Sequence, residues 1–393
     1  MTLFERSEYL ERIARVKQRI SGAGIDVLIL ESPENILYLT GYEGWSFYTH
    51  QAAIIALDHE EPILIVRKMD TACADFTVFM QAENIVGYPE HYIGVQDRHP
   101  MQFIAGLVQE RGWGRKRVGV EMDAHFFTAR AYQVLRDHLP DATFMDAYLL
   151  VNWVRTYKSD TEVALMRQAG RIAQLAMQTA IDNINVGTRE CDAAARIHHT
   201  QIAGTPEFGG SVPSDVAIPS GPRSAAPHLP WTDAPFADNV AVNIELGGAR
   251  HNYHSGLART VYLGKAPRQL KELAAVTVEG LKTALDAVRP GVTCEEVEAA
   301  WRRVIAKAGY EKKSRIGYAI GLCLQPAWLE LTASLQPGDR TVLVPNMTFH
   351  MICGMWQGEH NGNYNMVTSE TFLVTDHGHE LLSHLEQKLF EKS

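Results

Sequence analysis

Hydrophobic positions in the first 155 residues alternate between helical spacing and short apolar runs. Leu10, Ile13, Val16 and Ile20 recur every three or four residues, a spacing that predicts an amphipathic helix. Apolar runs predict strands at 25–30, 52–57, 62–66 and 118–121, and a further helix is predicted at 128–139. Helices and strands that alternate in this way indicate an α/β domain over residues 1–155.

A long helix is predicted directly after this domain. Ser159 and Glu162 have the spacing of a capping box, in which each side chain binds a free backbone amide at the start of a helix. Val163, Met166 and Ile172 then follow on one apolar side. We expect this helix to open a second domain over residues 156–393.

The second domain contains a candidate internal repeat. Four residues recur 104 positions later in the chain, namely Ala180, Asp182, Gly187 and Ala195 as Ala284, Asp286, Gly291 and Ala299. Chance similarity between alanine-rich helices is the alternative, but a glycine that follows an aspartate in both copies favours duplication. Two α-α-β units would pack helices on one side of a curved antiparallel sheet, with a pocket between the halves.

Composition narrows the class of protein. The chain has 393 residues, a hydrophobic fraction of 46% and a net charge of −9, and its basic residues are scattered, so nucleic acid is not an expected partner. Its five cysteines show no C-x-x-C spacing, which predicts neither a disulfide framework nor a zinc knuckle. No apolar run approaches the roughly 18 residues of a membrane span. We expect a cytoplasmic protein with no membrane partner.

The segment 240–262 predicts a β-hairpin, with strands at 240–246 and 256–262. Glu245 lies between the apolar residues Ile244 and Leu246, so alternation along the strand turns it to the opposite face. Carboxylates are rarely fully buried unless they are paired. Glu245 is therefore a candidate functional residue, although an ordinary strand carboxylate is the alternative.

Three parts of the chain resemble the pita-bread family of methionine aminopeptidase, prolidase, aminopeptidase P and creatinase. These are the segments 35–42 and 155–162 and the duplicated second domain. An α/β domain before a pita-bread domain is similar to the prolidase and creatinase branches. The resemblance implies an α+β pita-bread fold for residues 156–393 and a homodimer whose N-terminal domain closes the partner's active site.

Metallopeptidases of this family hold two metal ions with five ligands. The resemblance places these ligands on Glu245, Gly256, Tyr318, Ile352 and Glu370. Gly256 donates no side chain and leaves room where an aspartate would stand, and Ile352 is equally unable to bind a metal. Two neighbouring divalent ions need several anionic or imidazole ligands, so we expect no catalytic metal and no cofactor.

Four histidines near these positions are candidate replacement ligands, namely His251, His254, His350 and His360. Their spacing matches no recognised metal motif. We therefore interpret them as surface or interior histidines, and a single adventitious metal ion is the alternative.

The segment 220–228 resembles the histidine segment of creatinase, which hydrolyses a carbon–nitrogen bond without metal. The resemblance implies that His228 is a catalytic proton shuttle. It also implies that Glu245 and Glu370 lie close together, where one would attack the substrate or activate water and the other would balance a cationic charge. Which carboxylate has which role stays open.

The segment 41–50 is rich in aromatic residues, and the resemblance implies that it covers the pocket of the partner subunit. Trp45, Phe47 and Tyr48 could face a planar cation. For Trp45 and Phe47 a hydrophobic dimer contact is an equally favoured interpretation.

Other side chains are candidates for substrate binding. Arg223 or Arg259 could hold a carboxylate as a bidentate fork, although Arg259 is better explained as a support of the sheet. Tyr318 and His254 complete the expected substrate contacts.

The aromatic segment, the His228 segment and the missing ligands together are similar to the ectoine hydrolases, a creatinase-like branch. The resemblance implies a hydrolase that opens the ring of ectoine, a cyclic amidine with a carboxylate, to N-acetyl-2,4-diaminobutyrate without metal. The alternatives are a hydrolase of another guanidino or amidino acid, a metal-dependent Xaa-Pro peptidase and a non-enzymatic binding module.

Overall fold

A computed structural model describes residues 2–324 and 327–392. The chain forms two compact units, Met1–Arg155 and Thr156–Ser393, each with its own sheets. Among the described residues, no helix is both long and apolar enough to cross a bilayer.

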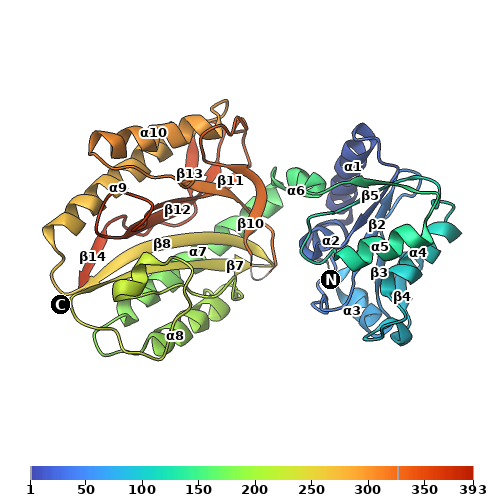
Figure 1. Cartoon of the computed structure of the whole chain (residues 1–393), viewed down its shortest axis with the longest axis horizontal. Helices are drawn as coiled ribbons and strands as arrows, with labels where there is room; N and C mark the ends of the chain where they lie inside the picture. Colours follow the sequence, from blue (N-terminus) through green and yellow to red (C-terminus); the bar gives the residue numbers. More distant parts are fainter. Residues whose placement is uncertain (1, 325–326, 393) are drawn as a thin grey trace. The chain divides into compact units, whose positions relative to one another are not determined.

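The first unit is built on a six-stranded sheet with the order β4-β3-β2-β1-β5-β6 (Figure 1). Its strands are β1 (Val27–Leu30), β2 (Ala52–Ala56), β3 (Ile63–Arg67), β4 (Ile85–Tyr88), β5 (Arg117–Val120) and β6 (Thr143–Asp146). Its α-helices are α1 (Arg6–Gly22), α2 (Pro33–Thr40), α3 (Thr71–Thr77), α4 (Pro100–Glu110), α5 (Ala129–His138) and α6 (Leu150–Arg155). The four predicted strands form the inner part of the sheet. The sequence missed β4 and β6, which are the edge strands and are only partly buried, so they lack a continuous apolar run.

The second unit begins with the predicted helix α7 (Asp160–Asn183). Ser159 Oγ accepts a hydrogen bond from the Glu162 backbone N–H at 3.2 Å, and the Glu162 carboxylate accepts one from the Ser159 N–H at 2.9 Å. The capping box is therefore confirmed.

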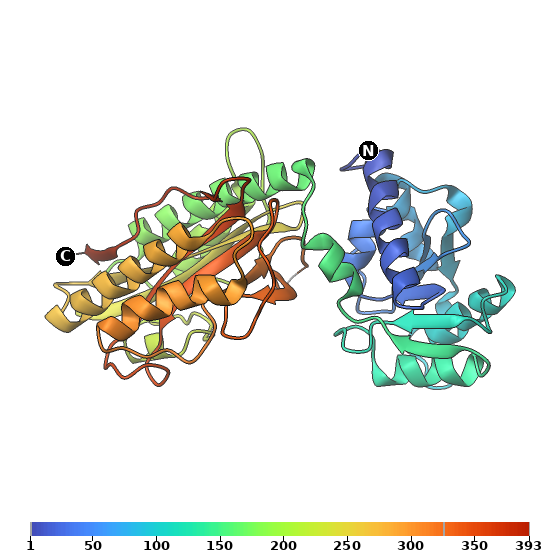
Figure 2. The ribbon, with the colours of Figure 1, turned by 90° about the horizontal axis from the view of Figure 1, so that it is seen from above.

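Two helices precede the strands in each half of this unit. The first half contains α7, α8 (Glu190–Ala203), β7 (Val240–Arg250) and β8 (Tyr253–Leu263). The second contains α9 (Arg268–Ala287), α10 (Cys294–Lys307), β9 (Gly317–Ile320), β10 (Leu329–Ser334), β11 (Thr348–Met355), β12 (Met366–Val374), β13 (His379–Leu381) and β14 (Leu389–Lys392). Figure 2 shows α9 and α10 side by side. The repeated glycines Gly187 and Gly291 have φ angles of 84° and 89°, a left-handed conformation that favours glycine, in the turn before the second helix of each half.

The predicted hairpin forms, and its strands are longer than expected. β7 and β8 pair antiparallel from Val240 opposite Leu263 to Arg250 opposite Tyr253. His251 and Asn252 form the turn with φ angles of 47° and 64°, as tight hairpin turns require.

Two sheets meet beside this hairpin. One has the order β14-β8-β7 and the other β10-β9-β11-β12-β13. Thr371 of β12 accepts a hydrogen bond from the Gly256 N–H and donates one to its carbonyl, so the centre of β8 is held against β12. This junction positions the residues of the candidate site.

Candidate active site

The second unit contains a pocket of about 600 Å³. Its walls come from the segments 214–217 and 227–230, from β7 and β9, and from the start of β10. The lining side chains that can hydrogen-bond or carry charge are Ser214, Asp215, His228, Glu245, Arg315, Tyr318 and Trp328. The structure thus brings together three residues that the sequence predicted for the site, namely His228, Glu245 and Tyr318.

Glu245 lies in the pocket wall with an uncommitted carboxylate. Its backbone is paired with Ala217, which accepts a hydrogen bond from the Glu245 N–H at 2.9 Å and donates one to its carbonyl at 3.0 Å. Within residues 2–324 and 327–392, the carboxylate has no hydrogen-bond or ion-pair partner. Burial raises the pKa of Glu245 to about 7. A carboxyl group of this kind is a candidate base or nucleophile.

The space beside Gly256 is occupied by the imidazole ring of His350. A Cβ atom at position 256 would lie 2.7 Å from both Nδ1 and Cε1 of that ring. Burial lowers the pKa of His350 to about 3, so the ring is neutral. The expectation that Gly256 leaves open room is wrong, because His350 fills it.

Tyr318 and Trp328 form one polar wall of the pocket. The Trp328 Nε1–H donates to Tyr318 Oη at 2.9 Å, and the His350 Nδ1 lies 3.2 Å from the same oxygen. Burial, and then the charge of Glu245, raise the pKa of Tyr318 above its usual range, so the phenol keeps its proton. The Arg315 guanidinium lies 4.7 Å from the centre of the Tyr318 ring and donates to Ser334 Oγ at 3.0 Å.

His228 is carried by a loop that Glu190 ties down at both ends. Glu190 accepts hydrogen bonds from Ser220 Oγ and from the backbone N–H and hydroxyl of Thr232, at 2.7–2.8 Å. It also forms an ion pair with Arg223 at 2.8 Å. Arg223 is not among the pocket residues, so the structure does not place it as the expected carboxylate fork; it supports the loop of His228 instead.

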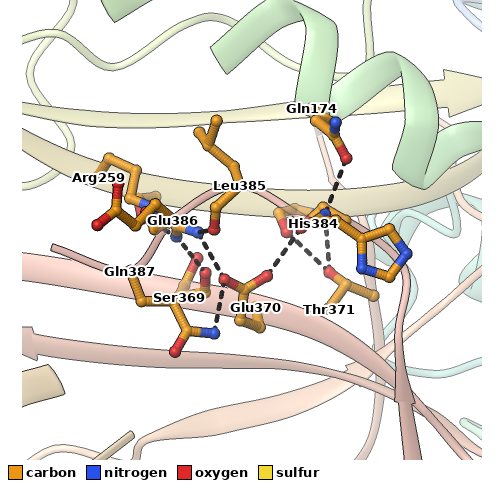
Figure 3. A network of polar contacts seen from close by, with 12 residues as sticks. Gln174, Arg259, Ser369, Glu370, Thr371, His384, Leu385, Glu386 and Gln387 are labelled. Atoms are coloured by element: carbon orange, nitrogen blue, oxygen red, sulfur yellow. Dashed lines mark hydrogen bonds and ion pairs between the residues drawn. The ribbon is translucent and has the colours of Figure 1, made fainter. Parts of the chain in front are cut away.

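Glu370 does not lie beside Glu245, which corrects the expected carboxylate pair. Figure 3 shows Glu370 with Arg259 and Gln387. Its carboxylate accepts from Arg259 Nη2 at 2.5 Å, from Ser383 Oγ at 2.8 Å and from Gln387 Nε2 at 3.1 Å. The physical reason is strand alternation. Arg259 pairs with Ile244, one position from Glu245, and therefore projects from the other face of the hairpin.

Arg259 supports the sheet, as the favoured interpretation had it. Its guanidinium is fully buried and also donates to the backbone carbonyls of Ala258, Ser369, Leu385 and Glu386. It is not a pocket residue.

His254 is also outside the pocket. Its ring is only 2% exposed, and Nε2 lies 2.9 Å from the carbonyl oxygen of Cys323. Burial lowers the pKa of His254 to about 4. The structure therefore places this predicted substrate contact in the interior.

The aromatic segment 41–50 belongs to the first unit. Trp45 and Tyr48 are 77% and 70% exposed, and the Tyr48 hydroxyl accepts a hydrogen bond from Arg67 at 3.3 Å. Phe47 packs on Phe126 with ring centres 5.2 Å apart. Aromatic side chains are enriched in protein–protein interfaces, and these two exposed rings are available for such a contact.

Comparisons with known proteins match both units. The Creatinase/Prolidase N-terminal domain matches residues 12–157, and Metallopeptidase family M24 matches residues 164–376. The chain belongs to family M24. Relatives of this M24 chain include an uncharacterised hydrolase/peptidase, y4tM, of Sinorhizobium fredii (43% identity over 99% of this chain and 98% of the relative). Another is the ectoine hydrolase of Halomonas elongata (38% identity, with the same coverage of both chains).

Solved structures of dipeptidases share the fold. The Xaa-Pro dipeptidase of Bacillus anthracis has a TM-score of 0.81 at 23% identity, covering 98% of this chain and 99% of that chain. Together these comparisons confirm the predicted creatinase-type N-terminal domain, the pita-bread domain and the hydrolase class.

The metal centre of M24 metallopeptidases does not fit this site. Of the five positions that the resemblance assigns to ligands, Glu245 alone directs a carboxylate to the pocket, since Glu370 is bound to Arg259. Position 256 is blocked by His350. In the described part of the chain, no group of three or more His, Cys, Asp or Glu side chains is arranged to hold a metal ion.

Several residues of the site were not predicted from the sequence. Arg315 and Trp328 line the pocket although neither belongs to a recognisable motif. Arg315 lies three positions before Tyr318, and this closeness in sequence could have indicated that it lines the same pocket. His350 was considered only as a replacement metal ligand, and Ser369 was not predicted, because the contact between them depends on the pairing of β11 with β12.

Proposed function

We propose that the protein hydrolyses a cyclic amidine that carries a carboxylate, with ectoine as the substrate and N-acetyl-2,4-diaminobutyrate as the product, without a metal ion. The observation that carries this proposal is the uncommitted carboxylate of Glu245, in a pocket whose family metal ligands are missing. The 38% identity to an ectoine hydrolase over nearly the whole chain supports it.

The charges of the pocket suit such a zwitterion. Glu245 can bind an amidinium, and Arg315 supplies a guanidinium for the carboxylate. A volume of about 600 Å³ lies in the range of small-molecule sites. Because a bound cation favours the charged form of a neighbouring carboxyl group, the amidinium would lower the pKa of Glu245 again. Glu245 would then enter the reaction as a carboxylate.

Glu245 and His228 carry the proposed reaction. Glu245 either forms a bond to the amidine carbon itself or takes a proton from a water molecule whose oxygen attacks that carbon. His228 donates a proton to the ring nitrogen as the carbon–nitrogen bond breaks. When Glu245 is the nucleophile, water then hydrolyses the bond between the Glu245 carboxylate and the former amidine carbon. Both routes consume one water, convert the amidine carbon into an acetyl carbonyl and release an amine.

We also propose that the active form is a homodimer in which the segment 41–50 closes the partner's pocket. The exposure of Trp45 and Tyr48 supports this assignment. Sedimentation of the wild-type protein should show a dimer. Substitution of Trp45→Ala should raise the KM for ectoine, whereas a monomeric wild-type enzyme with full activity would contradict the proposal.

The test is the turnover of ectoine by metal-stripped protein in the presence of a chelator, with the products followed by NMR. We expect ring opening by the wild-type enzyme and a loss of at least about 100-fold in kcat for Glu245→Gln, the usual scale for a general base. Glu380→Gln, which changes a surface glutamate on β13, is the matched control. Wild-type turnover by Glu245→Gln would refute its role. Hydrolysis of Xaa-Pro dipeptides that requires added manganese would instead favour a peptidase.

A further inference from the structure

A chain of hydrogen bonds leads from β12 to the pocket. Ser369 Oγ lies 2.7 Å from Nε2 of His350, whose Nδ1 lies 3.2 Å from Tyr318 Oη. Trp328 Nε1 lies 2.9 Å from the same phenol oxygen. His350 occupies the space beside position 256, where the family's metal ligand is lost. This series of hydrogen bonds therefore replaces part of the family's metal site.

The direction of each bond follows from the donors available. An indole N–H can only donate, so Tyr318 Oη accepts the bond from Trp328. The Ser369 hydroxyl is fully buried, and among the described residues its one partner is His350 Nε2. A buried donor without an acceptor costs more free energy than an unused acceptor lone pair. Ser369 therefore donates to Nε2.

The proton of His350 then lies on Nδ1. A neutral imidazole has one N–H, and the burial that lowers the pKa of His350 keeps the ring neutral. Nδ1–H donates to Tyr318 Oη, which now accepts two hydrogen bonds. The phenol O–H has no acceptor on this side and is directed toward the pocket that Tyr318 lines.

We propose that Ser369 and His350 orient Tyr318 as a hydrogen-bond donor, and that Tyr318 and Arg315 together bind the carboxylate of the substrate. Arg315 lies against the Tyr318 ring and lines the same pocket. The pocket is thereby divided between Glu245, an acceptor for the cationic end of a ligand, and two donors for its anionic end. The assignment of the ligand rests on the proposed function, whereas the direction of the hydrogen bonds does not. Tyr318 would touch the substrate, and His350 is a positioning residue.

The tautomer of His350 can be measured without substrate. We expect ¹⁵N-histidine NMR of the full-length protein to show the His350 proton on Nδ1, with the signal assigned by its disappearance in His350→Gln. A proton on Nε2 would overturn the proposal, because Tyr318 would then donate to His350 instead of the pocket. This result stands even if ectoine is not a substrate, so the two proposals fail separately.

Kinetics with two substrates test the carboxylate contact. For ectoine, Tyr318→Phe should raise KM by about 10- to 100-fold, the scale of a hydrogen bond to a charged group. For 2-methyl-1,4,5,6-tetrahydropyrimidine, which is the same ring without the carboxylate, KM should change less than about threefold. Equal increases for both compounds would refute the contact.

A double-mutant cycle separates positioning from structural damage. His350→Gln should raise the KM for ectoine in the wild-type background and have no further effect on KM in Tyr318→Phe. His360→Gln is the matched control, because His360 is another largely buried imidazole whose Nε2 contacts the Tyr364 carbonyl instead of the pocket. Additive effects of His350→Gln and Tyr318→Phe would show that His350 does not act through Tyr318.

Discussion

Glu245 on β7 and Glu370 on β12 are two glutamates of the second unit with opposite surroundings. Glu370 is fully buried and accepts hydrogen bonds from Arg259, Ser383 and Gln387. Glu245 has no side-chain partner in the described part of the chain, and burial raises its pKa to about 7. Since Arg259 pairs with Ile244, the two environments are separated by one position along the hairpin.

The difference separates a structural carboxylate from one that can interact with a ligand. The charge of Glu370 is balanced by Arg259, so its carboxylate is not available to a ligand. The same guanidinium also donates to the backbone of the segment 383–387 and so links this segment to β12. Glu245 is held in place by its backbone, while its charge is left for a ligand to balance. Sites that bind or transform ligands often retain such locally unfavourable groups.

The largest expected effect on stability comes from Glu370→Gln. This change leaves the Arg259 guanidinium buried without its counter-charge, and breaking a buried ion pair costs about 3–5 kcal/mol. Urea unfolding should show this loss, while kcat of the folded fraction stays near the wild-type value. Glu386→Gln, an exposed neighbour, should change stability by less than about 1 kcal/mol. A stable but inactive Glu370→Gln protein would show that Glu370 acts in the reaction and does not stabilise the fold.

Glu370 stabilises the folded protein, whereas Glu245 is expected to destabilise it when the pH is raised. Its pKa of about 7 in the folded protein lies above the usual value of 4.5, so between these pH values the folded state binds more protons than the unfolded state. The contribution of Glu245 to stability therefore falls as the pH rises from about 4.5 to 7. One pKa unit corresponds to about 1.4 kcal/mol, which gives an upper limit of about 3.5 kcal/mol.

Glu245→Gln should remove this dependence. Between pH 5 and pH 8 the free energy of unfolding of the wild-type protein should fall relative to that of Glu245→Gln, by roughly 1–3 kcal/mol. Denaturation curves at both pH values for the two proteins measure the difference. Parallel changes in the two proteins would mean that Glu245 is not a buried, unpaired carboxylate.

The sequence was sufficient for most of the fold. The strands at the centre of the first unit, the capping box at Ser159 and the duplicated helices with Gly187 and Gly291 were all predicted, because each depends on local periodicity or on a single turn. The edge strands β4 and β6 were missed because they lack continuous apolar runs.

The candidate site was only partly predictable. Glu245 was predicted from strand alternation and His228 from motif resemblance, and the pocket contains both. The placement of Glu370 was wrong because the face to which a strand residue points changes with a shift of one position. Arg223 and His254 were predicted as substrate contacts, but the structure places both outside the pocket, since partners far away in sequence hold them.

An intermediate effect on stability is expected from Gly256→Ala. This substitution tests whether the His350 ring fills the space beside position 256. The new methyl group would approach His350 Nδ1 and Cε1 to 2.7 Å, so the ring must move. Overpacking of this kind costs about 1–3 kcal/mol. Gly106→Ala, at a helix position where a Cβ meets no atom within 4 Å, is the control and should not lower stability. Unchanged stability of Gly256→Ala would show that the space beside position 256 is open.

The smallest effect is expected at Arg223, whose carboxylate partner Glu190 stands between the two extremes. The Arg223 side chain is 33% exposed, so Arg223→Gln should cost no more than about 1 kcal/mol of stability. Because Glu190 would still hold Ser220 and Thr232, the loop should loosen without unfolding. A less firmly held His228 predicts a decrease in kcat of up to about tenfold with little change in KM. A large increase in KM with unchanged kcat would instead restore Arg223 as a direct contact of the substrate carboxylate, and the difference between the two parameters decides between these roles.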